Sequence, residues 1–388
     1  NDGFRDLLAS SSQPGQRLLV AQQEETRRAQ SAIALMRQLI EYHHIFDLNK
    51  LSTNPRKNIA DFQFVAALNP SAGSFEINPR LQRWFATFAI GLPSPSSLIT
   101  IYHAFLQGHL THGEFPEEIV EMGGNIIKAA LGVHGAVASK FRKTAANFHY
   151  EFNIRHLAGV FQGILMAKPA KFTTAEKFVF MWCHECERIY GDRLVSYEHL
   201  DKFYKIMETQ AKKAFSSFNT GRFYSEEDPD PLVFCHFGDG IGEDPIYDQI
   251  VEQEKLQHTL DAALEDYNET NVQMDLVLFN DAMRHICKIT RVINNPAGHA
   301  LLVGVGGSGK QSLSRLSSSI CDYTTIMITI SATYGVNDLK ADLQTMYAMA
   351  GVQQKGVTFL FTDNQITNER FLVYINDLLN SGKIADLY

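Results

Sequence analysis

The pattern of apolar and polar residues divides the chain into stretches that predict different structures. Residues 1–29 show no sustained period, and we expect an irregular extension there. In the next stretch apolar positions recur at helical spacing, and Thr173 with Glu176 predicts a capping box that begins a helix over 178–190. One segment departs from this pattern, because the apolar run at 61–68 predicts a buried strand that ends in a turn.

Beyond a polar connector, the pattern changes to an alternation of strands and helices. A long helical run ends at Asn295-Pro296. The segments that follow are a strand at 300–305, a helix at 310–320, a strand at 325–330, a helix at 339–349, a strand at 357–362 and a helix at 371–379 closed by Gly382. This alternation predicts a parallel sheet flanked by helices, which is an α/β fold. We place the regions of the chain at 1–29, 30–214, 215–259 (the connector) and 260–388.

Composition limits the kinds of function open to this chain. Its 388 residues are 45% hydrophobic and 20% charged, which allows cores of ordinary size in two or three domains. The net charge of −8 gives no basic excess, so we expect no nucleic-acid partner. The sequence has no run of about 18 apolar residues, so we expect no membrane span. Five cysteines, few and odd in number, indicate reduced thiols and a cytosolic setting.

The sharpest chemical signal is the segment Gly304–Lys310, which fits the pattern G-x-x-x-x-G-K between a predicted strand and a predicted helix. Glycines let the backbone turn its N–H groups toward phosphate oxygens, and the helix adds the positive end of its dipole. Lys310 adds a charge for the β- and γ-phosphates. The alternative, a turn that only connects strand to helix, is disfavoured by this context. The pattern predicts an ATP or ADP site formed by Gly304, Gly306, Gly307, Ser308, Gly309, Lys310, Gln311 and Ser312.

Two departures from the usual pattern concern the metal and hydrolysis. Gln311 stands where a Ser or Thr hydroxyl would hold Mg²⁺, and Ser312 follows one place later. The apolar strand at 359–362 ends in Asp363, whose carboxylate can hold Mg²⁺ through water, although a solvated strand-end acid is the alternative. Asn364 stands in place of the glutamate that polarises water in many such ATPases. We expect Asp363 and Ser312 to bind Mg²⁺ and the site to hydrolyse ATP slowly.

Two further groups of residues have ordinary structural explanations. Asn69 ends the predicted strand, and Arg83 follows, so they could orient a water and reach a phosphate across an interface. From spacing alone, an Asn-Pro turn and a surface charge explain them better. The cluster Cys183–Cys186 has no second pair at zinc-ligand spacing and shares a helix face with apolar residues, so we expect a core role.

Several motifs together resemble dynein heavy chains of the axonemal type, found in cilia and flagella. The motifs similar to the family's fourth AAA+ module are 304–313 (GVGGSGKQSL), 359–363 (FLFTD) and 375–382 (INDLLNSG), and glutamine after the lysine is usual there. The motifs that resemble the latter half of the third module are 64–85, 148–163 and 182–194. The resemblance covers about residues 31–388, whereas 1–29 does not resemble the family.

The resemblance implies a fold and roles for site residues. Residues 30–214 would be the rear of a third AAA+ module with a helical small subdomain, and 260–388 the front of a fourth, P-loop module. Asn69 matches the residue that senses the γ-phosphate, Arg83 an arginine finger and Arg155 a second sensor. Together with Asp363, these are the candidate catalytic residues.

The resemblance also implies a setting for the chain. It would be a piece of an ATP-driven, minus-end-directed microtubule motor of the ciliary axoneme, and it would supply a regulatory nucleotide site. Its partners would be neighbouring AAA+ modules, dynein intermediate and light chains, and microtubules through regions that this chain lacks. The alternative is a scaffold fragment without a working pocket, and nucleotide-dependent thermal protection distinguishes the two.

Overall fold

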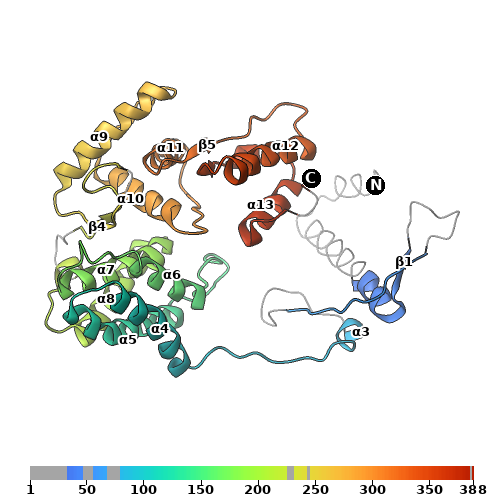
Figure 1. Cartoon of the computed structure of the whole chain (residues 1–388), viewed down its shortest axis with the longest axis horizontal. Coiled ribbons are helices and arrows are strands. Elements are labelled where there is room, and N and C mark those ends of the chain that lie inside the picture. Colours follow the sequence, from blue (N-terminus) through green and yellow to red (C-terminus); the bar gives the residue numbers. More distant parts are fainter. Residues whose placement is uncertain (1–32, 47–55, 68–78, 225–230, 243–244, 385–386) are drawn as a thin grey trace. The chain divides into compact units, whose positions relative to one another are not determined.

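A computed structural model describes residues 33–46, 56–67, 79–224, 231–242, 245–384 and 387–388 (Figure 1). The chain divides into two compact units, 1–92 and 93–388, which are taken here one at a time. The predictions for 1–32 and for Asn69 lie outside the described residues.

The first unit contains little regular structure. Residues 33–42 are helical, and β1 (His44–Phe46) pairs antiparallel with β2 (Arg56–Asn58). A short helix, α3 (Pro79–Gln82), follows. The strand predicted at 61–68 is wrong over the described residues 61–67, where no strand forms and Val65 is 99% exposed. An apolar run becomes a strand only where another strand supplies hydrogen bonds, and none of the described strands pairs with this segment.

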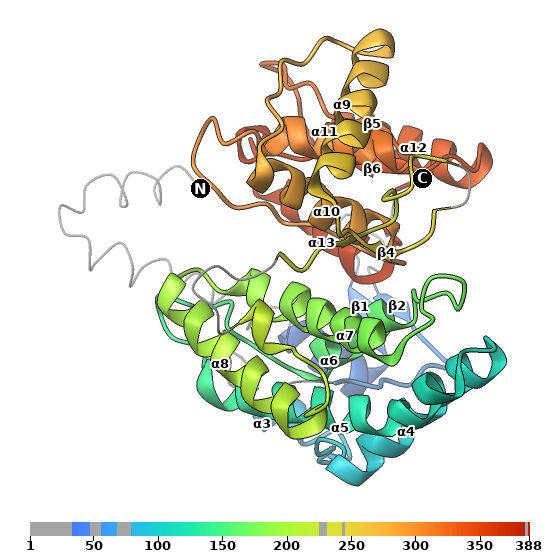
Figure 2. The same cartoon turned by 90° about the vertical axis from the view of Figure 1, so that its left-hand side faces the viewer.

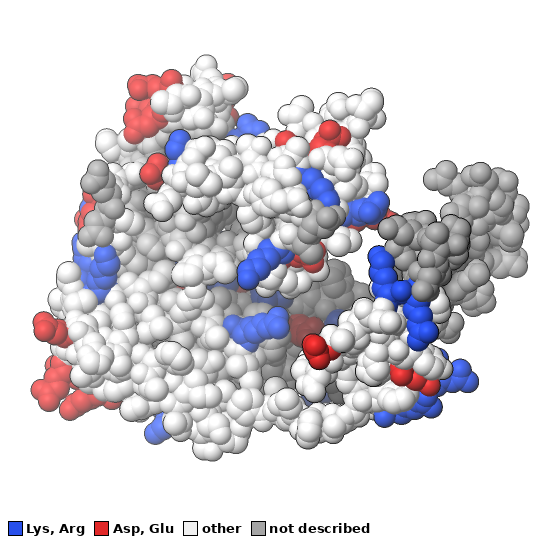
Figure 3. All heavy atoms as spheres, turned by 45° about the vertical axis from the view of Figure 1, so that its right-hand side comes forward, with Lys and Arg blue, Asp and Glu red and all other residues white. Residues whose placement is uncertain are grey.

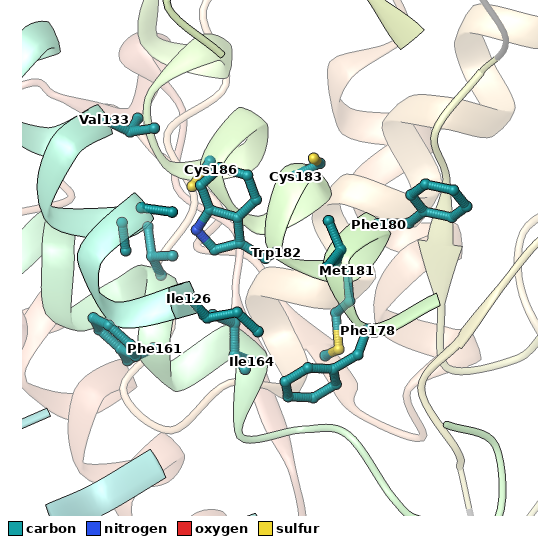
Figure 4. Packing of buried hydrophobic residues seen from close by; sticks show 14 of the residues in the cluster. Ile126, Val133, Phe161, Ile164, Phe178, Phe180, Met181, Trp182, Cys183 and Cys186 are labelled. Carbon is teal, nitrogen blue, oxygen red and sulfur yellow. The ribbon is translucent and has the colours of Figure 1, made fainter. Parts of the chain in front are cut away.

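The second unit begins with a group of helices packed around one core. They are α4 (Pro95–His112), α5 (Glu117–Lys140), α6 (Ile154–Ile164), α7 (Ala175–Ile189), the turn η2 (Gly191–Arg193) and α8 (Tyr197–Ala214). Figure 4 shows Trp182 of α7 among side chains of α5 and α6, including Ile126, Phe161 and Ile164. This apolar face is what holds the helices together, because it removes large side chains from water.

Hydroxyl and amide side chains begin several of these helices. The helix predicted at 178–190 is confirmed, but its cap lies one residue later than expected. Thr174, with an extended backbone, accepts a hydrogen bond from the Lys177 N–H at 3.4 Å. Because Thr173 carries the same side chain as Thr174, the sequence alone could not show which of the two caps the helix.

A second group of elements completes the unit, and Figures 1 and 2 show it beside the helical group. The turn η3 (Gly221–Phe223) still packs on the helical core through Phe223, and the second group begins with β3 (Phe234–Cys235), β4 (Asp248–Gln249), α9 (Gln253–Thr270) and α10 (Asn280–Asn294). β3 and β4 are antiparallel. The long run of apolar positions predicted to end near Asn295 is confirmed as α10, whose buried residues include Met283, Ile286 and Ile289.

From residue 310 onward, the α/β alternation follows in the predicted order, with shorter strands. The elements are α11 (Lys310–Ile320), β5 (Thr324–Ile326), α12 (Val336–Tyr347), η4 (Ala348–Val352), β6 (Val357–Phe359), η5 (Asp363–Gln365) and α13 (Arg370–Ser381). β5 and β6 are parallel, which confirms the predicted kind of sheet. Gly382 has a φ of 64° and caps α13, since glycine adopts this left-handed conformation without strain.

The strand predicted at 300–305 is wrong. These residues form no regular element and pair with no described strand, and Leu301 and Val303 are 89% and 87% exposed. The described strands β5 and β6 pair only with each other. A β-branched, apolar sequence favours a strand only where a neighbour accepts its hydrogen bonds, so the sequence signal was insufficient here.

The described charged side chains can be followed on one face of the molecule. On the face drawn in Figure 3, described acidic and basic side chains are interspersed. This arrangement fits the modest net charge of −8. Among the described residues, none of the helices combines the length and the apolar character needed to cross a membrane.

Candidate nucleotide-binding site

The segment Gly304–Lys310 forms a turn that leads directly into α11. Gly307 and Gly309 have φ values of 78° and 74°, which an L-residue with a side chain rarely adopts. Gly309 is the residue that precedes the first turn of α11. The first N–H groups of a helix have no partner within the helix, so this turn presents backbone donors at a positive helix end.

Lys310 folds back over its own loop. Its ammonium Nζ donates to the carbonyl oxygens of Gly304 and Val305, each at 2.7 Å, and approaches Ser308 Oγ at 3.2 Å. The charge of Lys310 is therefore already directed at the loop interior, where a phosphate group would interact with it.

The glycines also leave the space beside the loop open. A Cβ added at Gly306, Gly307 or Gly309 would meet no heavy atom within 4 Å. Backbone donors, a lysine ammonium and free space are what a polyphosphate needs. The loop residues therefore fit a nucleotide phosphate chain.

Helix α11 holds the loop in place through its buried face. Leu313 and Leu316 join the apolar cluster that includes residues of α10. Ser318 Oγ donates to Tyr323 O and is hydrogen-bonded to Thr358 Oγ1 of β6, both at 2.9 Å. These contacts tie the helix that begins at Lys310 to both α10 and the parallel strand pair.

The predicted metal residues are less closely assembled. Asp363 is exposed at the first position of η5, Gln311 is exposed and Ser312 is half-buried. Within the described residues, no hydrogen bond or ion pair joins Asp363 to the loop. Carboxylate and hydroxyl oxygens are suitable Mg²⁺ ligands, so both residues fit the metal chemically, and their role stays a prediction.

Gln365 fixes the turn that carries Asp363, a role that sequence reasoning missed. Its side-chain Oε1 accepts from the Thr362 N–H at 2.8 Å, and its Nε2 donates to Ile328 O at 2.7 Å. The Gln365 side chain is buried, and its two hydrogen bonds hold the turn that follows β6. A Thr-x-x-Gln spacing is a capping pattern, and this signal was available in the sequence.

Of the predicted sensor and finger residues, Arg155 alone lies in the described part of the unit that holds the loop, and no described contact joins it to the loop. Asn69 lies outside the described residues. Arg83 belongs to the first unit, where its guanidinium is 3.8 Å from Glu41 and 5.0 Å from the ring centroid of Trp84. Arg155 is exposed in the first turn of α6. Their roles at a nucleotide stay predictions.

The cluster Cys183–Cys186 lies in the helical core, as expected. Both thiols are buried among apolar side chains of α7 and its neighbours (Figure 4). Burial raises the pKa of the Cys183 thiol to about 12, so it stays protonated at neutral pH.

One buried polar group was not anticipated from the sequence. Glu185 of α7 lies between the apolar neighbours just described and forms an ion pair with Arg291 of α10, while Tyr247 and His184 also contact its carboxylate. We refer to these four residues as the Glu185 junction. Glu185 and Arg291 each stand on an otherwise apolar face of their helix, and this is a signal for a buried ion pair. The sequence did not show that these two residues pair with each other.

Comparison with known proteins identifies the modules. Residues 274–388 match a family described as the P-loop containing dynein motor region D4, 126–222 match an AAA+ lid domain, and 19–93 match a P-loop containing dynein motor region. The chain is 54% identical over 356 residues to the dynein alpha chain of the flagellar outer arm of Chlamydomonas reinhardtii. This chain belongs to the axonemal dynein heavy-chain family. The family match at 19–93 begins within the segment 1–29, which we expected to be unlike the family.

Other dynein relatives give the same result. Identity is 44% to the ciliary dynein beta chain of Tripneustes gratilla and 44% to human dynein axonemal heavy chain 9. These alignments and that to the alpha chain cover 91–92% of this chain and 8% of each relative. The chain therefore spans less than a tenth of the length of these dyneins. Its modules have the AAA+ P-loop fold, which is a nucleotide-binding fold.

Proposed function

We propose that the loop at 304–312 binds ATP or ADP together with Mg²⁺. The observation that carries this proposal is the position of Lys310, whose ammonium is directed into a turn with two left-handed glycines at the start of α11. The turn supplies backbone donors, and the lysine supplies the charge that β- and γ-phosphates need. Ser312 and Asp363 would hold the metal ion, which neutralises phosphate charge when bound.

We propose further that the site hydrolyses ATP slowly and acts as a regulatory site. Asn364 follows Asp363, and a neutral amide is a poor base for the attacking water. Gln311 offers no hydroxyl to the metal. Binding would then change the populations of module conformations more than it would drive turnover.

The setting that we propose is that of the relatives. The chain would act within an ATP-driven, minus-end-directed microtubule motor of the ciliary or flagellar axoneme. Arg83 would reach the nucleotide of the neighbouring AAA+ module, Asn69 would sense a γ-phosphate and Arg155 would be a second sensor. Intermediate and light chains and microtubules would be partners of the whole heavy chain.

Thermal unfolding with and without Mg-ATP tests the binding proposal. A ligand that binds only the folded protein at 100 times its Kd adds about 2.7 kcal/mol to the free energy of unfolding. We expect this protection for the unchanged chain and its loss in Lys310→Ala. Lys340→Ala, a lysine on α12 outside the loop, is the control and should keep the protection. No protection in the unchanged chain would favour a scaffold without a working pocket.

Single-turnover kinetics tests slow hydrolysis. If the missing base limits the rate, Asn364→Glu should raise the rate of ATP cleavage by about 100-fold, the lower end of general-base effects. Asn368→Glu, in the same turn-rich segment, is the matched control and should leave the rate unchanged. Rapid ATP cleavage by the unchanged chain would contradict the proposal. Equal effects of the two substitutions on the cleavage rate would also contradict it.

A further inference from the structure

The Glu185 junction contains a fully buried ion pair with several hydrogen bonds. Arg291 Nε lies 3.2 Å and 3.1 Å from the two carboxylate oxygens of Glu185, and Arg291 Nη2 also donates to Oε2. The Tyr247 hydroxyl donates to Glu185 Oε1 at 2.8 Å, and His184 Nδ1 is 3.1 Å from the same oxygen. Both partners of the ion pair are almost without solvent exposure. The charges are therefore paired and hydrogen-bonded on several sides.

Four separate chain segments meet at this carboxylate. Glu185 is on α7, Arg291 on α10 and Tyr247 in the segment before β4. The backbone of α6 completes the enclosure at Gly163, where an added Cβ would lie 1.7 Å from Glu185 Oε2. The absence of a side chain at Gly163 therefore allows the carboxylate to reach its place.

A second ionic contact joins the same elements. Lys288 Nζ of α10 is 2.8 Å from Asp192 Oδ1 in η2, and Arg188 Nε of α7 is 2.8 Å from Asp192 Oδ2. Lys288 and Arg291 are three residues apart on α10, so they lie on one face of that helix. Two directional contacts therefore set the rotation and the position of α10 against α7.

Helix α10 in turn supports the nucleotide loop. Ile286 and Ile289 of α10 share an apolar cluster with Leu313 and Leu316 of α11. The first residue of α11 is Lys310. A shift of α10 along its axis would thus move the helix that begins at the phosphate-binding lysine, because packed helices respond as units.

We propose that Glu185 and Arg291 are positioning residues for the loop 304–310. Their pair fixes one placement of α10 on the helical group, and α10 fixes α11 and the loop at its start. A buried ion pair is poor at adding stability over apolar packing, but its fixed geometry can select a single register. The inference rests on the proposed nucleotide function for its affinity readout, and it also predicts a change that is measurable without nucleotide.

The experiment uses the full chain with Glu185→Gln, Arg291→Gln and the double variant. Each single change breaks the same pair, so we expect each to weaken Mg-ATP binding about tenfold and the double variant to be no weaker than either. Without nucleotide, hydrogen exchange of the backbone amides in 306–316 should be faster in all three variants than in the unchanged chain.

Two controls separate positioning from general destabilisation. Glu198→Gln breaks the exposed pair with Lys202 on α8 and should change neither readout. Met207→Ala removes a fully buried side chain from the helical core, and it should lower the unfolding temperature while exchange at 306–316 stays unchanged. If Glu185→Gln does not fold, Tyr247→Phe keeps both charges and should produce a smaller increase of exchange.

The outcomes that overturn the inference are specific. Unchanged exchange at 306–316 in the junction variants would overturn it, as would affinity losses that add in the double variant. An unchanged chain that binds no nucleotide would instead contradict the proposed function, and the exchange result would still decide the role of Glu185 and Arg291.

Discussion

The nucleotide loop and the Glu185 junction differ in how their residues are brought together. In the loop, the described hydrogen bonds of the Lys310 ammonium go to residues two to six positions away, and most of the loop is exposed. In the junction, Glu185 and Arg291 are 106 positions apart and buried. The loop is formed by local backbone conformation, whereas the junction exists only once two groups of helices have packed.

This difference explains why the nucleotide loop, and not the Glu185 junction, could be predicted from the sequence. A loop that binds a ligand needs glycines and a lysine at fixed spacing, so its pattern is readable along the chain. A buried ion pair needs only one acid and one base anywhere in the sequence, provided that the fold makes them meet. Ligand-binding loops can therefore be recognised from local sequence patterns. Residues that position one element against another cannot.

The largest effect that we predict is on the junction. Arg291→Ala leaves the Glu185 carboxylate buried without its partner, which costs about 3–5 kcal/mol of unfolding free energy. Chemical denaturation monitored by tryptophan fluorescence measures this, since Trp182 lies in the same helix as Glu185.

The same helix provides a matched control for that prediction. Arg284 of α10 is 3.7 Å from Asp281, with 44% of its side chain exposed. Arg284→Ala should therefore cost less than about 1 kcal/mol, as exposed pairs do. Equal losses for Arg284→Ala and Arg291→Ala would show that burial of the junction does not matter.

Much of the second unit followed from its sequence. The helices at 310–320 and 371–379 were readable because apolar period and capping residues are local signals, and the alternation of helices with strands predicted the parallel kind of sheet. The strands at 61–68 and 300–305 were wrong because pairing is not local. The apolar residues there gave the propensity of a strand without the neighbour that makes one.

The residues of the candidate site also fall into two groups, those that depend on their neighbours in sequence and those that depend on distant contacts. Gly307, Gly309 and Lys310 take the conformations that their motif predicts, since each depends on its immediate neighbours. Gln365 and Gly163 act through contacts with distant residues, and nothing in their own surroundings distinguished them beyond a capping spacing. The conformation of the loop was predictable from its local sequence, while the contacts between distant residues that support it were not.

A second prediction concerns pH and the surroundings of the junction. Burial lowers the pKa of His236 to about 4, and its ring lies 4.7 Å from that of Tyr247. The unfolded chain then binds more protons than the folded chain between pH 4 and the unfolded value near 6.5. Stability is therefore full above pH 6.5 and falls as the pH decreases toward 4, by up to about 1.4 kcal/mol per pH unit for this group.

Thermal unfolding between pH 7.5 and 4.5 measures this dependence. His236→Asn cannot titrate, so its melting temperature should decrease less on acidification than that of the unchanged chain. Burial and the charge of Arg193 also lower the pKa of His156 to about 4, so His156→Asn should remove a separate share of the slope. A slope that neither substitution reduces would contradict this assignment.

The smallest effect that we predict lies in the loop and arises from backbone conformation alone. Gly306 and Gly309 both have free space where a Cβ would stand, but only Gly309 has a positive φ, 74°. Gly309→Ala should lower the free energy of unfolding by about 1 kcal/mol through left-handed strain, whereas Gly306→Ala should leave it nearly unchanged. Denaturant unfolding of the two variants without nucleotide measures the difference. Because an added Cβ would meet no heavy atom within 4 Å at either position, equal results would mean that the left-handed turn before Lys310 is not maintained, and the contrast with the side-chain-dependent junction would fail.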